Sequence, residues 1–327
     1  VTGTIENSQI KSTEKEQIRL ICSIFFDCIG NGDLLQDTKR NISNAMSRSK
    51  PANRRSSKPQ RDTANSGRKN PRSFRQGNAA TSQDSWLYGD HAVMAALANP
   101  ARKVLRLVMT WAKLEALDID TRGGIEEIVA PEVVDKDTIT ALLPENALHQ
   151  GIALLPAPLP EVTIADLPDA IASIPVVVAV LDQVTDPHNV GAILRSAAAF
   201  NVSALIMPDR HSPPVTGVLA KAASGALEMV PIIRVGNLSR ALDQLAETGF
   251  WRIGLDGHAT GELEQVADKF QKIAIVLGAE GKGLRQLTAQ KCDLIAKLPI
   301  SPRVESLNVS NAAAITFYEL TRGKRSC

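Results

Sequence analysis

Aromatic residues and cysteines are scarce in this chain of 327 residues. Aromatic side chains make up only 4% of it. The cysteines are Cys22, Cys28, Cys292 and Cys327, and they form no CxxC pair and no cluster with histidines. The sequence therefore predicts neither a zinc site nor a disulfide framework. This cysteine usage is typical of a reducing compartment, and we expect a cytoplasmic protein that binds no metal.

Long apolar runs are missing from the N-terminal region. The apolar run at residues 20–26 ends at Asp27, far short of the roughly 20 residues that a membrane span needs. No small-residue cleavage site typical of a signal peptide accompanies it. The sequence therefore predicts neither a membrane anchor nor a secretion signal in this region.

Positive charge is concentrated in one segment. Residues 41–78 contain ten Lys or Arg and a single acidic residue, Asp62. Residues 47–81 have almost no apolar side chains, so we predict that they are disordered. Basic arms of this kind commonly bind polyanions through phosphate contacts, and a merely solvating tail is the alternative. A further hypothesis is that Met46 is the true start and that residues 1–45 are an upstream extension of the reading frame. Residues 1–82 are thus expected to form a disordered, basic N-terminal extension.

Alternating short elements follow from residue 85. We predict helices at residues 91–97, 112–117 and 137–143, and strands at 104–110, 126–130 and 149–155. The proline-rich run that starts at Pro156 predicts a linker over residues 158–174. Residues 85–157 are therefore expected to form a small α/β domain.

A second unit is expected over residues 175–325. Its first strand, residues 175–181, is a continuous apolar run typical of a buried parallel strand. Further strands are expected near residues 203–207, 230–234, 251–255, 273–277 and 294–298. Helices are expected near residues 189–200, 214–227, 238–248, 283–291 and 307–322. This alternation predicts an α/β fold with a parallel sheet flanked by helices. Ligands bind such sheets at the carboxyl ends of the strands, so the loops after residues 181, 277 and 298 are the candidate site.

Each of these loops carries groups suited to a site, and each also has a simpler structural explanation. The first contains Asn189 and Arg195, although Asp186-Pro187 with Asn189 would also make an ordinary turn and helix cap. The second, residues 277–283, reads LGAEGKG, a glycine-rich path that matches neither the dinucleotide nor the P-loop fingerprint. The third, residues 305–311, reads ESLNVSN and could simply cap the helix that follows, although it has more small polar residues than one helix cap requires.

Taken together, the three loops resemble the signature motifs of the SpoU (TrmH) family of RNA ribose 2′-O-methyltransferases. The matching segments are residues 189–191 with 195–197, residues 277–283 and residues 306–310. Residues 88–93 (YGDHAV), 149–151 (HQG) and 221–228 (KAASGALE) place the chain nearest to the RlmB-like branch, whose usual substrate is a guanosine in large-subunit ribosomal RNA. In that branch the small domain is an RNA-binding substrate domain.

The resemblance implies S-adenosyl-L-methionine as cofactor, a C-terminal trefoil knot and a homodimer with the active site near the subunit contact. It implies catalytic roles for Asn189, Arg195, Glu280, Ser306 and Asn308. It implies that the cofactor is held around Leu277, Gly278, Glu280, Gly281, Ile300, Leu307 and Asn308. One departure is Ser301-Pro302-Arg303, where the family often has glycine. Proline lacks an amide donor, so cofactor contacts there are expected to differ.

The side-chain chemistry constrains the roles. A guanidinium stays protonated at neutral pH and is therefore a poor general base, so we expect Arg195 to orient a phosphate and to stabilise the developing alkoxide. We expect Glu280 to orient Asn189 or Arg195 through a charge-assisted hydrogen bond. His188 is an alternative base, although a turn histidine more often faces solvent. Lys282 and Arg285 either contact RNA phosphates or form a solvated surface.

Three functions remain open at this point. The motifs favour an enzyme that methylates ribosomal RNA. A transfer-RNA 2′-O-methyltransferase and a non-catalytic RNA-binding or ribosome-assembly factor that retains the fold are the alternatives.

Overall fold

The structure is a computed structural model that describes residues 83–170, 175–267, 269–279 and 281–322. The predicted N-terminal extension, the Met46 hypothesis and the Glu280 side chain lie outside the described residues. Within them, no helix is long and apolar enough to cross a membrane.

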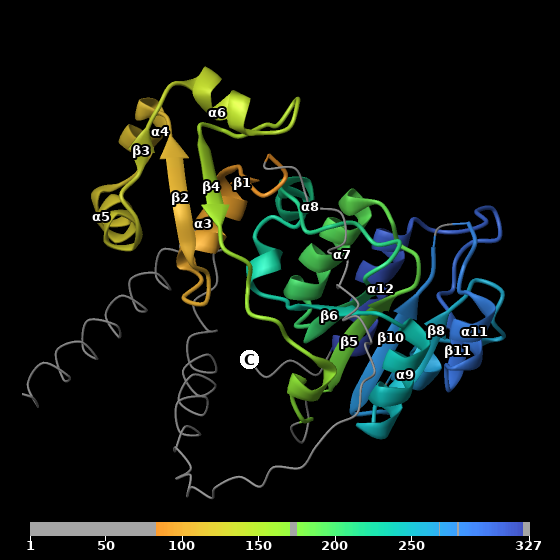
Figure 1. Cartoon of the computed structure of the whole chain (residues 1–327). Helices are drawn as coiled ribbons and strands as arrows, with labels where there is room; N and C mark the ends of the chain where they lie inside the picture. Colours follow the sequence, from red (N-terminus) through yellow and green to blue (C-terminus); the bar gives the residue numbers. More distant parts are fainter. Residues whose placement is uncertain (1–82, 171–174, 268, 280, 323–327) are drawn as a thin grey trace, which may run out of the picture. The chain divides into compact units, whose positions relative to one another are not determined.

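The first sheet is built from residues 87–156 (Figure 1). Its strands, in spatial order, are β1 (Leu87–Tyr88), β4 (Ile152–Pro156), β2 (Val104–Met109) and β3 (Glu132–Val133). The strand β4 is antiparallel to β1 and β2, whereas β3 is parallel to β2. The accompanying helices are α3 (Asp90–Ala98), α4 (Trp111–Ala116), α5 (Ile119–Ile128) and α6 (Lys136–Leu142).

Side-chain caps explain where three of these helices begin. Thr110, Asp118 and Asp135 each accept a hydrogen bond from a backbone amide in the first turn of α4, α5 and α6. The predicted strand at residues 126–130 is wrong. Residues 126–128 form the last turn of α5, which Asp118 starts and which buries Ile125. Strand β3 begins only after Pro131, so a helix cap eight residues upstream outweighed the short apolar pattern.

The second sheet has seven strands, and all of its pairings are parallel. In spatial order they are β7 (Ile232–Val235), β6 (Ala204–Pro208), β5 (Val176–Leu181), β10 (Lys272–Leu277), β8 (Trp251–Leu255), β11 (Leu294–Lys297) and β9 (Gly261–Glu262). The parallel sheet flanked by helices is as predicted. The short strand β9 was not expected from the sequence.

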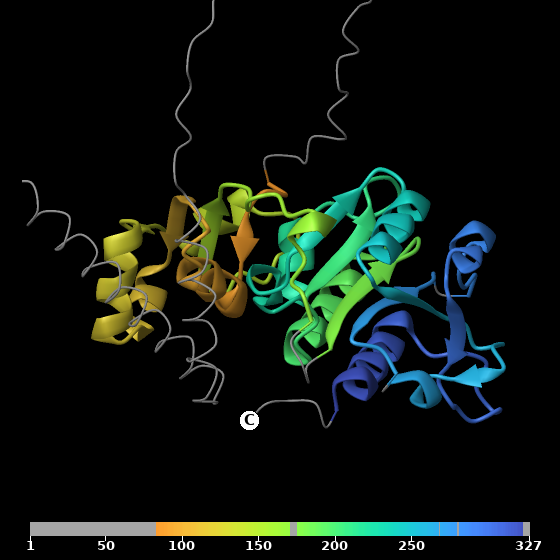
Figure 2. The ribbon, with the colours of Figure 1, turned by 90° about the horizontal axis from the view of Figure 1, so that it is seen from below.

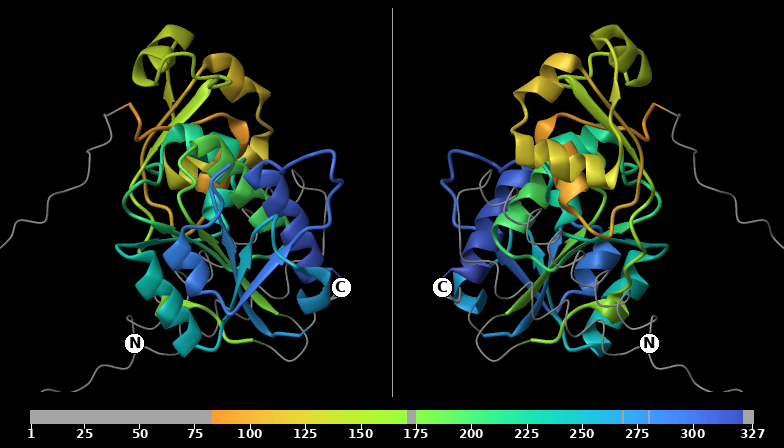
Figure 3. Two further views of the ribbon diagram at one scale, coloured as in Figure 1. Left: turned by 90° about the vertical axis from the view of Figure 1, so that its right-hand side faces the viewer. Right: turned by 90° about the vertical axis from the view of Figure 1, so that its left-hand side faces the viewer.

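Helices lie on both sides of this sheet (Figures 2 and 3). Val177, Ala179 and Leu181 of β5 join a core cluster with α7 (Pro187–Ala199) and α12 (Val309–Thr321). The intervening β5 valines join a second cluster with α9 (Leu238–Glu247) and the short 3-10 helix η1 (Ile164–Asp166). Because alternate residues of a strand face opposite sides, a strand buried on both faces must be continuously apolar.

Three shorter helices complete the second unit. They are α8 (Gly217–Ala222), α10 (Glu264–Ala267) and α11 (Gln286–Gln290), and a further 3-10 turn, η2, spans Ala226–Glu228. The predicted linker contains η1, whose Ile164 is buried against α9. The expected helix at residues 214–227 is divided into α8 and η2 because Ser224 and Gly225 both adopt positive φ between them.

Residues 221–228 contact the first sheet and its helices. The carboxylate of Glu228 accepts hydrogen bonds from Asn99 and from two guanidinium nitrogens of Arg102. Both members of this ion pair are almost fully buried, with 5% and 4% of their side chains exposed. The amine of Lys221 donates to the carbonyl of Leu148 and lies 5.5 Å from the centre of the Tyr88 ring. The motifs at residues 88–93, 149–151 and 221–228 therefore lie at one packed junction.

Candidate active site

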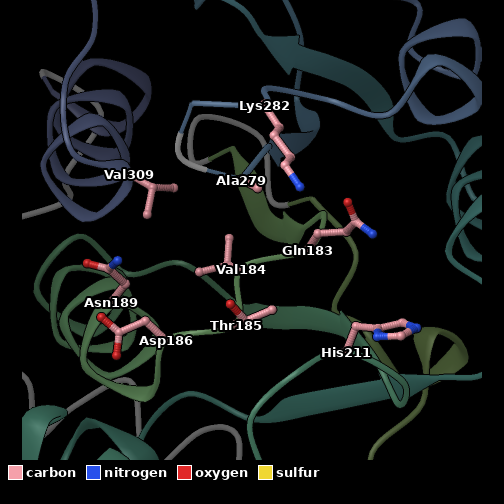
Figure 4. Close-up of a pocket in the computed structure, with 9 residues that line it drawn as sticks. All are labelled: Gln183, Val184, Thr185, Asp186, Asn189, His211, Ala279, Lys282 and Val309. Atoms are coloured by element: carbon pink, nitrogen blue, oxygen red, sulfur yellow. The ribbon is translucent and has the colours of Figure 1, made fainter.

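A cleft of about 370 Å³ opens at the carboxyl ends of three neighbouring strands, β6, β5 and β10. Figure 4 shows the residues that line it: Gln183, Val184, Thr185, Asp186, Asn189, His211, Ala279, Lys282 and Val309. Parallel sheets bind ligands at this edge because the loops that follow adjacent strands converge there. Its volume lies within the range of small-molecule sites.

The loop after β5 begins with a buried carboxylate. Asp182 is fully buried and its amide donates to the carbonyl of Leu277 at the end of β10. Asp186 then starts α7 by accepting from the amide of His188, with Pro187 at the first helical position. The cap and the proline together set the direction of α7, so that Asn189 in its first turn lines the cleft.

Asn189 is held by a residue 119 positions further along the chain. The side-chain amide of Asn308 donates to the side-chain oxygen of Asn189 at 3.1 Å. The side-chain oxygen of Asn308 also accepts from the amide of Ser310 at 2.9 Å and from its hydroxyl at 2.6 Å. Asn308 is thus the N-cap of α12 and a contact between two loops at once. The capping explanation of this stretch is correct for Asn308 but incomplete.

The glycine-rich loop after β10 is a closed hairpin. Ala279 and Gly283 exchange two backbone hydrogen bonds, of 3.2 and 2.9 Å. Gly281 and Gly283 have φ values of +76° and +63°, which side chains rarely adopt. A Cβ atom at Gly278 would lie 2.3 Å from the carbonyl carbon of Gly283. The backbone path of this loop therefore requires glycine at these positions.

The described residues provide no thiol nucleophile at this edge. Burial raises the pKa of Cys292 to about 12, so its thiol is neutral near pH 7. They also contain no group of three or more His, Cys, Asp or Glu that could hold a metal ion.

Comparison with known proteins identifies this arrangement. Residues 176–318 match the model of the SpoU rRNA methylase family. The chain is 40% identical over 245 residues to the 23S rRNA (guanosine-2′-O-)-methyltransferase RlmB of Vibrio cholerae, covering 72% of this chain and 96% of that protein. The chain belongs to the SpoU rRNA methylase family. It is accordingly an RNA methyltransferase that uses S-adenosyl-L-methionine.

Two further relatives extend the comparison. An uncharacterized tRNA/rRNA methyltransferase of Synechocystis is 41% identical over 242 residues, which cover 72% of this chain but only 62% of that protein. The crystal structure of the SpoU methyltransferase AviRb from Streptomyces viridochromogenes, in complex with AdoMet, shares the fold. Its TM-score is 0.61 at 22% identity, over 72% of this chain and 89% of that one.

The residues that match the SpoU motifs fall into two groups. Asn189 and Asn308 meet at the cleft, and Leu277 and Gly278 lead into the glycine hairpin there. Arg195 and Ser306 are exposed and do not line the cleft. Among the residues expected near the cofactor, Gly281 is exposed, Leu307 is half-buried and Ile300 is 38% exposed.

Several residues of the cleft are not among those that the motifs predict. His211 lies in the loop after β6. None of the expected SpoU motifs lies in that loop, but β6 is the neighbour of β5 in the sheet. Gln183 and Thr185 were within the first loop but were not singled out. Lys282 lines the cleft, and His188 is exposed and does not. The strand order predicts that the loop after β6 lies at the cleft, but that order is known only from the tertiary structure.

Proposed function

We propose that this protein transfers a methyl group from S-adenosyl-L-methionine to the ribose 2′-hydroxyl of a guanosine in 23S ribosomal RNA. The observation that carries the proposal is the hydrogen bond between Asn189 and Asn308. It joins the first and third SpoU motifs at the edge of the sheet where parallel α/β proteins bind ligands. The similarity to RlmB of Vibrio cholerae supports the choice of RNA and nucleotide.

The cofactor would be held around Leu277, Gly278, Glu280, Gly281, Ile300, Leu307 and Asn308. The described members of this set suit it chemically. Apart from Gly281 itself and its two chain neighbours, no residue lies within 4 Å of where a Cβ of Gly281 would be, so the backbone at this hairpin is open to a ligand. Exposed Ile300 and half-buried Leu307 offer apolar surface for an adenine ring. When bound, the sulfonium supplies an electrophilic methyl group.

The protein's own residues would act mainly by positioning. An in-line transfer requires the attacking hydroxyl to lie behind the methyl carbon, and orientation of this kind supplies much of the rate enhancement. Asn189 and Asn308 would orient the ribose, and Ser306 would shape the pocket. Arg195 would bind the nucleotide phosphate and stabilise the alkoxide as the 2′-hydroxyl proton passes to a phosphate oxygen or to water. Glu280 would orient Asn189 or Arg195.

A homodimer would bring the exposed motif residues to a site. Helix α12 packs against α7, which carries Arg195. On α12, Ile315 and Tyr318 are 47% and 51% exposed, and apolar groups exposed together on a helix favour a protein contact. Pairing of two copies through this surface would bury both side chains. It would also place Arg195 and Ser306 near a subunit contact.

We also propose a division of labour along the chain. Residues 1–82 would form the basic extension, residues 85–157 the RNA-binding substrate domain and residues 158–174 the linker. Residues 175–325 would form the catalytic domain, with its C-terminal segment threaded as a trefoil knot. Pro302 lies in the loop that the knot would form, and its missing amide would alter cofactor contacts there.

The test uses the full-length protein with labelled S-adenosyl-L-methionine and two RNAs, an unmodified 23S rRNA transcript and unmodified tRNA. We expect incorporation into the 23S transcript at one guanosine, mapped by the resistance of its phosphodiester bond to alkaline hydrolysis. Methylation of tRNA alone would establish the first alternative. Cofactor binding measured by calorimetry separates the second, because a non-catalytic RNA-binding factor need not bind the methyl donor.

A further inference from the structure

Two polar residues of the cleft adopt a left-handed backbone conformation. Gln183 has a φ of +63° and His211 a φ of +64°. Positive φ is uncommon for residues other than glycine, although asparagine, aspartate and histidine adopt it more often than most, and such conformations cluster at functional sites. The two residues follow β5 and β6, which are neighbours in the sheet. Both line the same cleft.

The backbone on either side of Gln183 is firmly held. Asp182 before it is fully buried and Val184 after it is 3% exposed. Gln183 itself is only half-buried, and its side chain lines the cleft between these two anchored neighbours. The positive φ lets the half-buried Gln183 side chain face the cleft between two buried neighbours, of which Val184 also lines the cleft.

The loop that carries His211 is also anchored. The amide of Asp209 donates to the carbonyl of Val235, at 2.9 Å. The guanidinium of Arg234 donates to the carbonyl of Pro213, and burial lowers the pKa of this Arg234. Two consecutive prolines then restrict the backbone. His211 is therefore presented by a stiff loop, which lowers the entropy cost of binding a ligand.

Both side chains are available to a ligand. Neither the amide of Gln183 nor the imidazole of His211 is hydrogen-bonded to another described residue. In Figure 4 they lie on the side of the cleft opposite Asn189 and Asp186, and Val184 and Thr185 lie between the two groups. The cleft thus has two polar ends, one at the Asn189–Asn308 pair and one at Gln183 and His211.

We propose that Gln183 and His211 recognise the guanine base of the nucleotide whose ribose lies at the Asn189–Asn308 end. This inference rests on the proposed function and assigns the specificity of the same site. The amide oxygen of Gln183 would accept hydrogen bonds from the guanine N1–H and N2 amino groups. Its NH₂ group, or the imidazole N–H of His211, would donate to O6. A base extruded from its stack is read at this edge by side chains in the pocket.

Glycine substitutions give the sharpest test. Gln183→Gly and His211→Gly remove the side chains and also suit the positive φ, so a loss of function cannot come from backbone strain. Asn201→Gly is the matched control, because Asn201 has a φ of +55° and is exposed but does not line the cleft. Thermal unfolding should show all three variants to be at least as stable as the unsubstituted protein.

The measurement is kcat/KM on the unmodified 23S rRNA transcript and on the same transcript with adenosine at the mapped position. We expect Gln183→Gly and His211→Gly each to lower kcat/KM for guanosine by about 10- to 100-fold, the effect typical of losing specific contacts to one base. The value of kcat/KM for the adenosine transcript is expected to be low already and should change little. The ratio of kcat/KM for guanosine to that for adenosine should therefore fall. Asn201→Gly should behave as the unsubstituted protein, and all variants should keep their affinity for S-adenosyl-L-methionine.

The two hypotheses fail in different ways. If the unsubstituted protein methylates neither transcript, the proposed function fails, and the base assignment fails with it. If it methylates the mapped guanosine and both glycine variants keep its selectivity, the proposed function stands and Gln183 and His211 do not read the base. A mapped nucleotide other than guanosine also overturns the assignment. A loss of rate on both transcripts at unchanged selectivity would mean that the two residues contact the phosphate or ribose instead.

Discussion

The side chain of Arg285 donates from Nε to the buried carboxylate of Asp182 at 2.6 Å, and its backbone amide donates to the same carboxylate at 3.0 Å. Asp182 is the first residue after β5, whereas Arg285 follows the glycine hairpin after β10, 103 residues later. The carboxylate is fully buried and the Arg285 side chain is 46% exposed. This pair therefore ties the first loop of the site to the second. The sequence had left Arg285 as either a phosphate contact or a solvated residue.

Loss of the Arg285 side chain should destabilise the protein. Arg285→Ala leaves the buried Asp182 carboxylate with fewer partners, and we expect a loss of about 2 kcal/mol in the free energy of unfolding, below the full cost of breaking a buried pair because Arg285 is partly exposed. Chemical denaturation measures it. Arg303→Ala is the control, since the Arg303 side chain makes no ion pair in the described structure. Equal stability of the two variants would show that the contact between Arg285 and Asp182 does not stabilise the fold.

Substitutions at the two asparagines should separate capping from catalysis. Asn189→Ala leaves the cap of α12 intact, so we expect a change in stability below about 1 kcal/mol and a fall in kcat/KM of roughly 100-fold through misplacement of the ribose. Asn308→Ser can still cap α12 but cannot reach Asn189 in the same way. We expect it to retain stability and to lose activity. Activity close to that of the unsubstituted protein in both variants would exclude the proposed positioning role.

The buried ion pair between Arg102 and Glu228 should contribute strongly to stability. Glu228→Ala leaves a buried guanidinium unpaired, and we expect a cost of about 3–5 kcal/mol. The matched control is Glu132→Ala, which breaks the exposed pair of Glu132 with Arg106 and should cost far less, because solvent screens an exposed ion pair. Thermal and chemical unfolding compare the two. A similar cost for both variants would mean that burial of the pair is unimportant.

Cys292 should resist alkylation in the folded protein. Because burial raises its pKa to about 12, almost none of it is thiolate at pH 8, and the thiolate is the reactive form. Iodoacetamide followed by peptide mass analysis should label Cys292 only after unfolding. Since the folded pKa exceeds the unfolded one, the folded state should lose stability as the pH rises above about 8.5. Rapid labelling of Cys292 under native conditions would overturn this account.

Local patterns along the chain predicted most elements correctly, and the failures have physical causes. The apolar run at residues 176–181 forms strand β5, which is buried on both faces. A strand buried on both faces must be apolar at every position, so its sequence alone predicts this burial. Residues 126–128 form helix instead of strand because they continue α5, which the Asp118 cap starts and the burial of Ile125 stabilises. These contacts outweigh the short apolar run at residues 128–130. The split between α8 and η2 depended on backbone conformations at Ser224 and Gly225 that residue types only suggest.

The sequence by itself determined the α/β class, the three polar loops and the family resemblance, because strand composition and motif spacing are local properties. Only the tertiary structure decided which of these residues meet. It brought Asn308 to Asn189 and Arg285 to Asp182, and it left Arg195 and Ser306 exposed. It also added His211 to the cleft, because β6 lies beside β5 in the sheet. Strand order and long-range hydrogen bonds bring together residues that are far apart in the chain. Nothing in the local sequence around either residue indicates that the two are close in space.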